Sequence, residues 1–178
     1  MALRPLATLL ATCTAWPLAA ADLNFCWQGA NGYTMTGKME FPDALMSHAV
    51  LTEQHVTRFK ISGYQNGTLI GSWDSRDAAP GATFHLRFDP VAMRFLTGGS
   101  FPGTFSQGWN ADGTAANCGQ AGFGFNSGNY AQDFCLDGAW ISDSSIDPAT
   151  PLLATTSPVA PDCSAGLQMS KAAARHSD

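Results

Sequence analysis

Hydrophobic and polar residues alternate along much of the first half of the chain, the pattern of β-strands with one buried face. In residues 33–41, Tyr, Met, Gly, Met and Phe occupy the odd positions, and Thr, Lys and Glu occupy the even ones. Residues 23–28 alternate in the same way, and residues 29–32 (Gly-Ala-Asn-Gly) supply turn chemistry between the two runs. We therefore predict a β-hairpin here.

The dipeptide Asn66-Gly67 predicts a second hairpin, because a two-residue type I′ turn needs positive φ at both central positions. It would join strands at 57–65 and 68–73, in a register that places Lys60 opposite Trp73. The face of this hairpin expected to enter the core carries Phe59, Ile61 and Ile70.

Residues 84–89 (Phe-His-Leu-Arg-Phe-Asp) alternate again and predict one further strand. Pro90 ends it, since proline cannot donate to a sheet ladder. Helical signals are confined to residues 43–55, where we predict one turn within 44–50 and another over 53–55 capped by Thr52.

The second half of the chain has a different amino-acid composition. Residues 97–140 contain ten glycines and eight aromatic residues, which predicts an ordered, loop-rich region of short strands. Residues 142–178 are rich in Ser, Thr, Pro and Ala, so we expect a weakly packed tail whose end, 171–178, is disordered. Residues 22–141 are thus predicted to form one all-β domain, an antiparallel β-sandwich or jelly-roll-like fold.

The N-terminus has the pattern of a secretory signal peptide over residues 1–21: Arg4, an apolar run over 6–18 and three alanines before Asp22. The run is too short for a membrane span of about 20 residues. We expect secretion or periplasmic export with cleavage after Ala21; the alternative is a lipoprotein anchored at Cys13.

Charge and cysteine content are consistent with this compartment. The formal net charge is −5 and becomes −6 once Arg4 is removed, which disfavours nucleic acid and anionic membranes as partners. Four cysteines remain, an even number that predicts two disulfides in an oxidising compartment. Three pairings are possible, and none of the spacings is typical of zinc ligands. We favour Cys118 with Cys135, closing a short loop, and Cys26 with Cys163, tying the two ends together.

Residues 33–37 (Tyr-Thr-Met-Thr-Gly), 51–59 (Leu-Thr-Glu-Gln-His-Val-Thr-Arg-Phe) and the Asn66-Gly67 turn resemble the N-terminal β repeat of uncharacterised exported bacterial proteins, including those with sorting tails of the PEP-CTERM kind. The resemblance covers about a third of the chain. The Pro-Glu-Pro motif, apolar helix and basic cluster of such tails are absent from the sequence. The resemblance implies export and β structure, and carries over no catalytic residue.

Two binding sites are conceivable in the glycine-rich half. Asn110, Asp112 and Thr114 offer oxygen ligands at alternating positions, as a calcium ion would require, although the EF-hand Gly and Glu are missing. The simpler interpretation, which we favour, is that the aspartates cap turns. No other cofactor is indicated.

The same region has the composition of a sugar-binding surface, where an aromatic face stacks on a pyranose and amides bond its hydroxyls. The simpler interpretation, which we favour for these aromatic residues, is that they form the core of the glycine-rich half. The candidate residues are Trp109, Tyr130 and Trp140 with Gln107, Asn110, Asn126, Asn129 and Asp133.

Catalytic patterns are weaker. Paired carboxylates among Asp112, Asp133 and Asp137 would suit a glycan hydrolase, and His85, Arg87 and Asp89 would share a strand face. No H-E-x-x-H or G-x-S-x-G motif occurs. We rank a non-catalytic exported domain that binds a glycan or another envelope component first, a structural envelope or matrix protein second, and a glycan hydrolase third.

Overall fold

The computed structural model describes residues 19–113, 118–119, 121–157 and 163. In this part of the chain, all regular structure is antiparallel β-sheet apart from three short 3₁₀ turns, which confirms the all-β prediction. Most of the predicted signal peptide and residues 171–178 lie outside the described residues.

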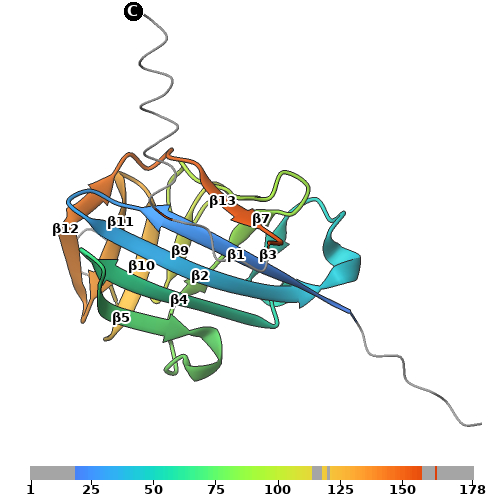
Figure 1. The fold of residues 1–178 in the computed structure, drawn as a ribbon, viewed down its shortest axis with the longest axis horizontal. Helices are drawn as coiled ribbons and strands as arrows, with labels where there is room; N and C mark the ends of the chain where they lie inside the picture. The colour runs from blue at the N-terminus through green and yellow to red at the C-terminus, as the bar shows by residue number, and fades with distance from the viewer. Residues whose placement is uncertain (1–18, 114–117, 120, 158–162, 164–178) are drawn as a thin grey trace, which may run out of the picture.

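The strands form two sheets that pack face to face and cross in projection (Figure 1). In spatial order, the large sheet consists of β3 (Leu51–Thr52), β7 (Arg87–Asp89), β8 (Arg94–Phe95), β13 (Leu152–Thr155), β1 (Ala20–Gln28), β2 (Tyr33–Pro42), β4 (Arg58–Gln65) and β5 (Thr68–Asp74). The small sheet consists of β12 (Ala139–Ile146), β11 (Ala131–Leu136), β10 (Phe123–Gly128), β9 (Gln107–Trp109) and β6 (Phe84–His85).

Both predicted hairpins are confirmed. The β1–β2 turn places Asn31 at φ 49° and Gly32 at φ 78°, and the β4–β5 turn places Asn66 at 48° and Gly67 at 81°. These are the positive φ angles that a type I′ turn requires.

The predicted register of the second hairpin was wrong by one residue. A bulge between Gly63 and Tyr64 shifts the pairing, so Lys60 faces Asp74 and Ile61 faces Trp73. Because side chains alternate between faces, this shift turns Trp73 into the core.

The predicted strand at 84–89 is divided between the two sheets. β6 pairs with β9 in the small sheet, whereas β7 pairs with β3 and β8 in the large one. Buried Leu86 is the crossing point. His85 and Arg87 therefore do not share the strand face expected from the sequence. The two helical turns are 3₁₀ turns, η1 (Asp43–Leu45) and η2 (Glu53–His55), the second capped by Thr52 as predicted.

The domain extends past the expected boundary at residue 141. Strand β12 continues to Ile146, and β13 inserts between β8 and β1 with Leu152 buried. The Ser/Thr/Pro-rich composition concealed β13, because this strand is only four residues long.

The core between the sheets is largely aromatic. Trp109 lies at its centre with an exposed fraction of 0%, and its ring packs against four phenylalanine rings at centroid distances of 4.6–5.6 Å. These four are Phe25, Phe59, Phe95 and Phe125.

Both predicted disulfides are confirmed: Cys26–Cys163 and Cys118–Cys135. They indicate an oxidising compartment outside the cytoplasm. Within the described residues, no helix has the length and apolar character needed to span a membrane.

Candidate functional site

A pocket of about 420 Å³ opens on the outer face of the small sheet, the face turned away from the core. Five of its lining residues are ones the sequence had suggested for sugar binding: Asn126, Asn129, Tyr130, Asp133 and Trp140. The remaining lining residues are Gly113, Gly128, Ala131, Ser142 and Ser145.

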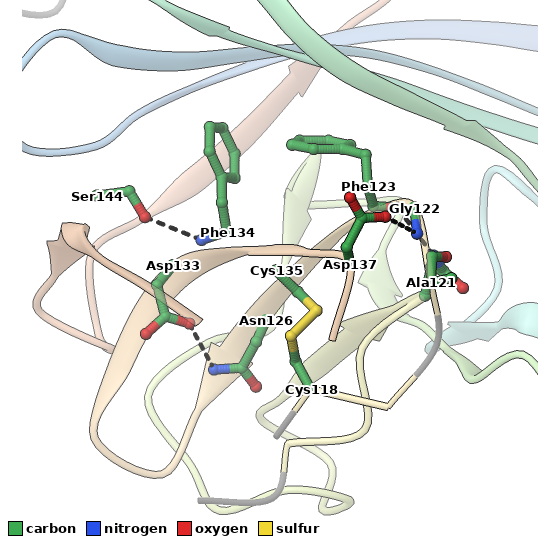
Figure 2. The surroundings of a disulfide bond; sticks show 11 residues. Cys118, Ala121, Gly122, Phe123, Asn126, Asp133, Phe134, Cys135, Asp137 and Ser144 are labelled. Atoms are coloured by element: carbon green, nitrogen blue, oxygen red, sulfur yellow. Dashed lines mark hydrogen bonds between the residues drawn. A yellow bond between two sulfur atoms is a disulfide. The ribbon is translucent and has the colours of Figure 1, made fainter. Parts of the chain in front are cut away.

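Strand alternation explains why polar side chains floor this pocket. On β10, Phe123 and Phe125 enter the core, so Asn126 points to the opposite face. Asn126 pairs directly with Asp133 of β11, and its Nδ2 lies 3.2 Å from Asp133 Oδ1 (Figure 2). The two side chains form the polar centre of the site.

The turn between β10 and β11 forms one wall. Asn129, at φ 55°, donates from Nδ2 to the Gly113 carbonyl at 2.9 Å and accepts from the Phe101 amide at 3.1 Å. These bonds hold two loops against the end of the hairpin. Tyr130, next in the turn, is 90% exposed, so its ring is available to a ligand.

Trp140 forms the opposite wall. It pairs with Cys135 across β11 and β12 and packs partly buried against the cluster of Ala111, Cys118 and Cys135. The Cys118–Cys135 disulfide (Figure 2) is therefore packed beside a residue that lines the pocket. Beyond Trp140, the side chains of β12 do not alternate regularly between the two faces of the sheet. The reason is a register shift in the β11–β12 pairing between Gln132 and Phe134.

The register shift places Ser145 next to Asp133 and Ser144 next to Phe134. Ser144 turns inward and its Oγ accepts from the Phe134 amide at 3.0 Å. Ser145 turns outward and donates to Asp133 Oδ2 at 3.2 Å. Ser142 and Ser145 were not predicted, because a bulge that reorders side chains leaves no periodic trace in the sequence.

Asp133 is the acidic group of the pocket. Partial burial raises the pKa of its carboxyl above the usual range, although the hydrogen bonds from Asn126 and Ser145 act in the opposite direction. The carboxylate thus accepts one hydrogen bond on each oxygen and is only partly hydrated.

Three of the predicted sugar-binding residues lie elsewhere. Trp109 belongs to the core, so it is excluded from any surface site. Asn110 is also buried and donates from Nδ2 to the carbonyls of Ala121 and Phe123, both at 3.0 Å, where it braces the disulfide loop. Gln107 likewise is buried and bonds the backbone of Arg87 and Leu96.

The suggested calcium site is described only in part. Asn110 is buried and its Nδ2 donates to two backbone carbonyls, whereas Thr114 lies outside the described residues. Among residues 19–113, 118–119, 121–157 and 163, no three His, Cys, Asp or Glu side chains come together as a metal would require.

The suggested carboxylate pairs do not meet in the pocket. Asp137 sits in the β11–β12 turn at φ 50°, where its Oδ1 accepts from the Gly122 amide at 2.8 Å (Figure 2). Asp112 lies on the loop beyond Asn110 and is not a lining residue. Asp133 is the sole carboxylate among the pocket's lining residues.

The chain matches no protein-family model, and no curated protein and no solved structure is significantly similar to it. The site's own geometry must therefore carry the functional argument.

Proposed function

We propose that the protein is an exported, non-catalytic carbohydrate-binding domain whose site is the pocket on the outer face of the small sheet. The observation that carries the proposal is the combination of an exposed Tyr130 and a partly exposed Trp140 around Asn126, Asn129 and Asp133. Sugars are amphipathic, so they bind where an aromatic face and side-chain hydrogen-bonding groups converge.

The positions of these groups support binding rather than hydrolysis. A hydrolase of the usual kind needs two carboxyl groups about 5–10 Å apart around the bond to be cleaved. The pocket lining offers Asp133 and serine, asparagine and aromatic side chains. Export is part of the proposal because the two disulfides fit an oxidising compartment and the N-terminal sequence resembles a signal peptide.

Calorimetric titration of the oxidised protein with oligosaccharides of neutral hexoses, N-acetylhexosamines and free hexosamines tests the proposal. We expect at least one class to bind, and Tyr130→Ala to weaken it by about tenfold or more, equivalent to ~1.4 kcal/mol. Tyr64→Ala is the matched control, since Tyr64 lies on β4 of the other sheet. Failure of all three classes to bind, or equal binding by Tyr130→Ala and the unchanged protein, would overturn the proposal.

A further inference from the structure

Within the described residues, the negative charge of the pocket has no positively charged neighbour. Asp133 is the charged side chain among its lining residues, and none of the ion pairs in the described structure includes it. The sequence contains no Lys or Arg between Arg94 and Lys171, so β9 to β13 bring none to the site. The other charged groups on the elements around Asp133 are themselves acidic: Asp112, Asp137 and Asp143.

An amide oxygen next to Asp133, Asn126 Oδ1, has no hydrogen-bond donor in the described structure. Asn126 is only 5% exposed, and its amide is oriented by Nδ2, which donates to Ala131 O at 3.3 Å and to Asp133 Oδ1 at 3.2 Å. Asn126 Oδ1 is left with no hydrogen-bond partner in the described structure. Asn126 therefore provides an acceptor next to Asp133 whose hydrogen-bonding capacity is unused.

We propose that this pocket selects a sugar with a free, protonated amine, a glucosamine-type residue, whose ammonium group binds beside Asp133 while the ring lies against Tyr130 and Trp140. This inference rests on the proposed carbohydrate-binding function and specifies its ligand class. An ammonium donates hydrogen bonds, neutralises the carboxylate, and is attracted to aromatic faces. A neutral sugar would also donate hydrogen bonds and place its ring against the aromatic side chains, but it would not neutralise the carboxylate.

The protonation behaviour of Asp133 is consistent with such a ligand. Burial raises the pKa of this carboxyl in the free protein. A bound ammonium would favour the ionised form, so binding should release protons at pH values where the free carboxyl is still partly protonated. Affinity should rise as the pH increases through that range and fall once the pH deprotonates the amine of the sugar.

The experiment compares oligomers of glucosamine, N-acetylglucosamine and glucose of matched length, titrated calorimetrically at slightly acidic pH and at two salt concentrations. We expect the glucosamine oligomer to bind at least about tenfold more tightly than the other two, with an affinity that falls as salt increases. Equal or tighter binding of the N-acetylated or neutral oligomer would overturn the amine inference and leave carbohydrate binding intact. Binding of none of the three would overturn both.

Asp133→Asn tests the role of the carboxylate. An asparagine here can still accept from Asn126 through its oxygen and donate to Ser145 Oγ, so the hydrogen-bond pattern can persist without the charge. We expect this variant to lose the preference for glucosamine over N-acetylglucosamine. Asp143→Asn, an equal change of charge at an exposed position on β12, should retain it. Equal loss in both variants would show that overall charge, rather than the pocket, is responsible, and would refute the inference.

Discussion

Asn126 and Asp133 face each other directly across β10 and β11, with Asn126 Nδ2 3.2 Å from Asp133 Oδ1. Ser145 donates to the second oxygen of Asp133, so each carboxylate oxygen accepts one hydrogen bond. Two neutral donors offset only part of the cost of removing a carboxylate from water. The ionised Asp133 thus lowers the stability of the folded state.

Asp133→Asn should raise the stability of the unliganded protein at neutral pH. Because the folded state raises the pKa of Asp133, it binds the proton more tightly than the unfolded chain does. This contribution to stability is therefore greatest at low pH and is lost as the pH rises through the folded-state pKa. The melting temperatures of the two proteins should converge at low pH and separate near neutrality, with the variant higher. A variant that melts lower at every pH would contradict this account.

The ring of Phe123 should make Gly63 intolerant of any side chain. Phe123 reaches from the small sheet to β4 and β5, and a Cβ at Gly63 would overlap its ring atoms. Gly63→Ala is expected to cost about 1–3 kcal/mol of unfolding free energy, measured by urea denaturation. Ser62→Ala, on the opposite face of the same strand, should change stability much less.

A second substitution separates crowding from backbone effects at Gly63. Phe123→Leu removes the ring that a Cβ at residue 63 would overlap. In that background, Gly63→Ala should therefore lower the free energy of unfolding by less than it does in the unchanged protein, giving a non-additive double-mutant cycle. Additive costs would mean that the glycine is needed for its backbone freedom and not for its contact with Phe123.

The sequence predicted the features that depend on neighbouring residues. Asn66-Gly67 specified its own hairpin through local φ preferences, and the closely spaced Cys118 and Cys135 specified a short covalent loop. Part of the pocket lining could be predicted for the same reason. Local folding brings four of the lining residues together because they belong to one hairpin: Asn126, Asn129, Tyr130 and Asp133.

Features that depend on the packing of distant segments were missed. Trp109 and Trp140 both lie in the glycine-rich half of the chain, yet Trp109 is at the centre of the core and Trp140 lines the pocket. Which tryptophan is buried is decided by Phe25 and Phe59 of the other sheet, whose contacts no local pattern reveals. Similarly, the change of sheet at Leu86 depends on which strands lie on each side of it.

Removal of the Cys118–Cys135 disulfide should weaken the site as well as the fold. The bridge closes a 17-residue separation, so replacing both cysteines by alanine is expected to cost about 3 kcal/mol in the chain-entropy model. Trp140, a lining residue, pairs with Cys135 and packs against the disulfide cluster, so sugar affinity should fall even where the variant is fully folded. Calorimetry well below the melting temperature measures this.

The other disulfide provides the control. Replacing Cys26 and Cys163 by alanine should cost more stability, about 5 kcal/mol in the same treatment, because the sequence separation is 137 residues. Cys26 lies on β1 of the large sheet, away from the lining residues, so affinity at a temperature where the variant is folded should be unchanged. Equal effects of both replacements on binding would show that the disulfide loop has no specific part in the pocket.

His85 should make the fold sensitive to mild acid. Its ring is buried beside Phe101, Nε2 lies 3.0 Å from the Gly103 carbonyl, and burial, the largest influence, lowers its pKa. The unfolded chain therefore takes up a proton at a higher pH than the folded protein does. Stability should fall by up to about 1.4 kcal/mol per pH unit as the pH drops from the ordinary histidine pKa toward the lowered one.

Thermal melts of the unchanged protein and of His85→Gln between neutral and mildly acidic pH measure this dependence. Glutamine can still donate to the Gly103 carbonyl but does not titrate, so the variant should lose the part of the acid sensitivity that begins in the histidine range. His48→Gln, at an exposed position before β3, should keep it. Identical pH profiles for His85→Gln and the unchanged protein would mean that the buried ring accepts a proton in place without cost, and that the Gly103 carbonyl, rather than burial, governs its charge.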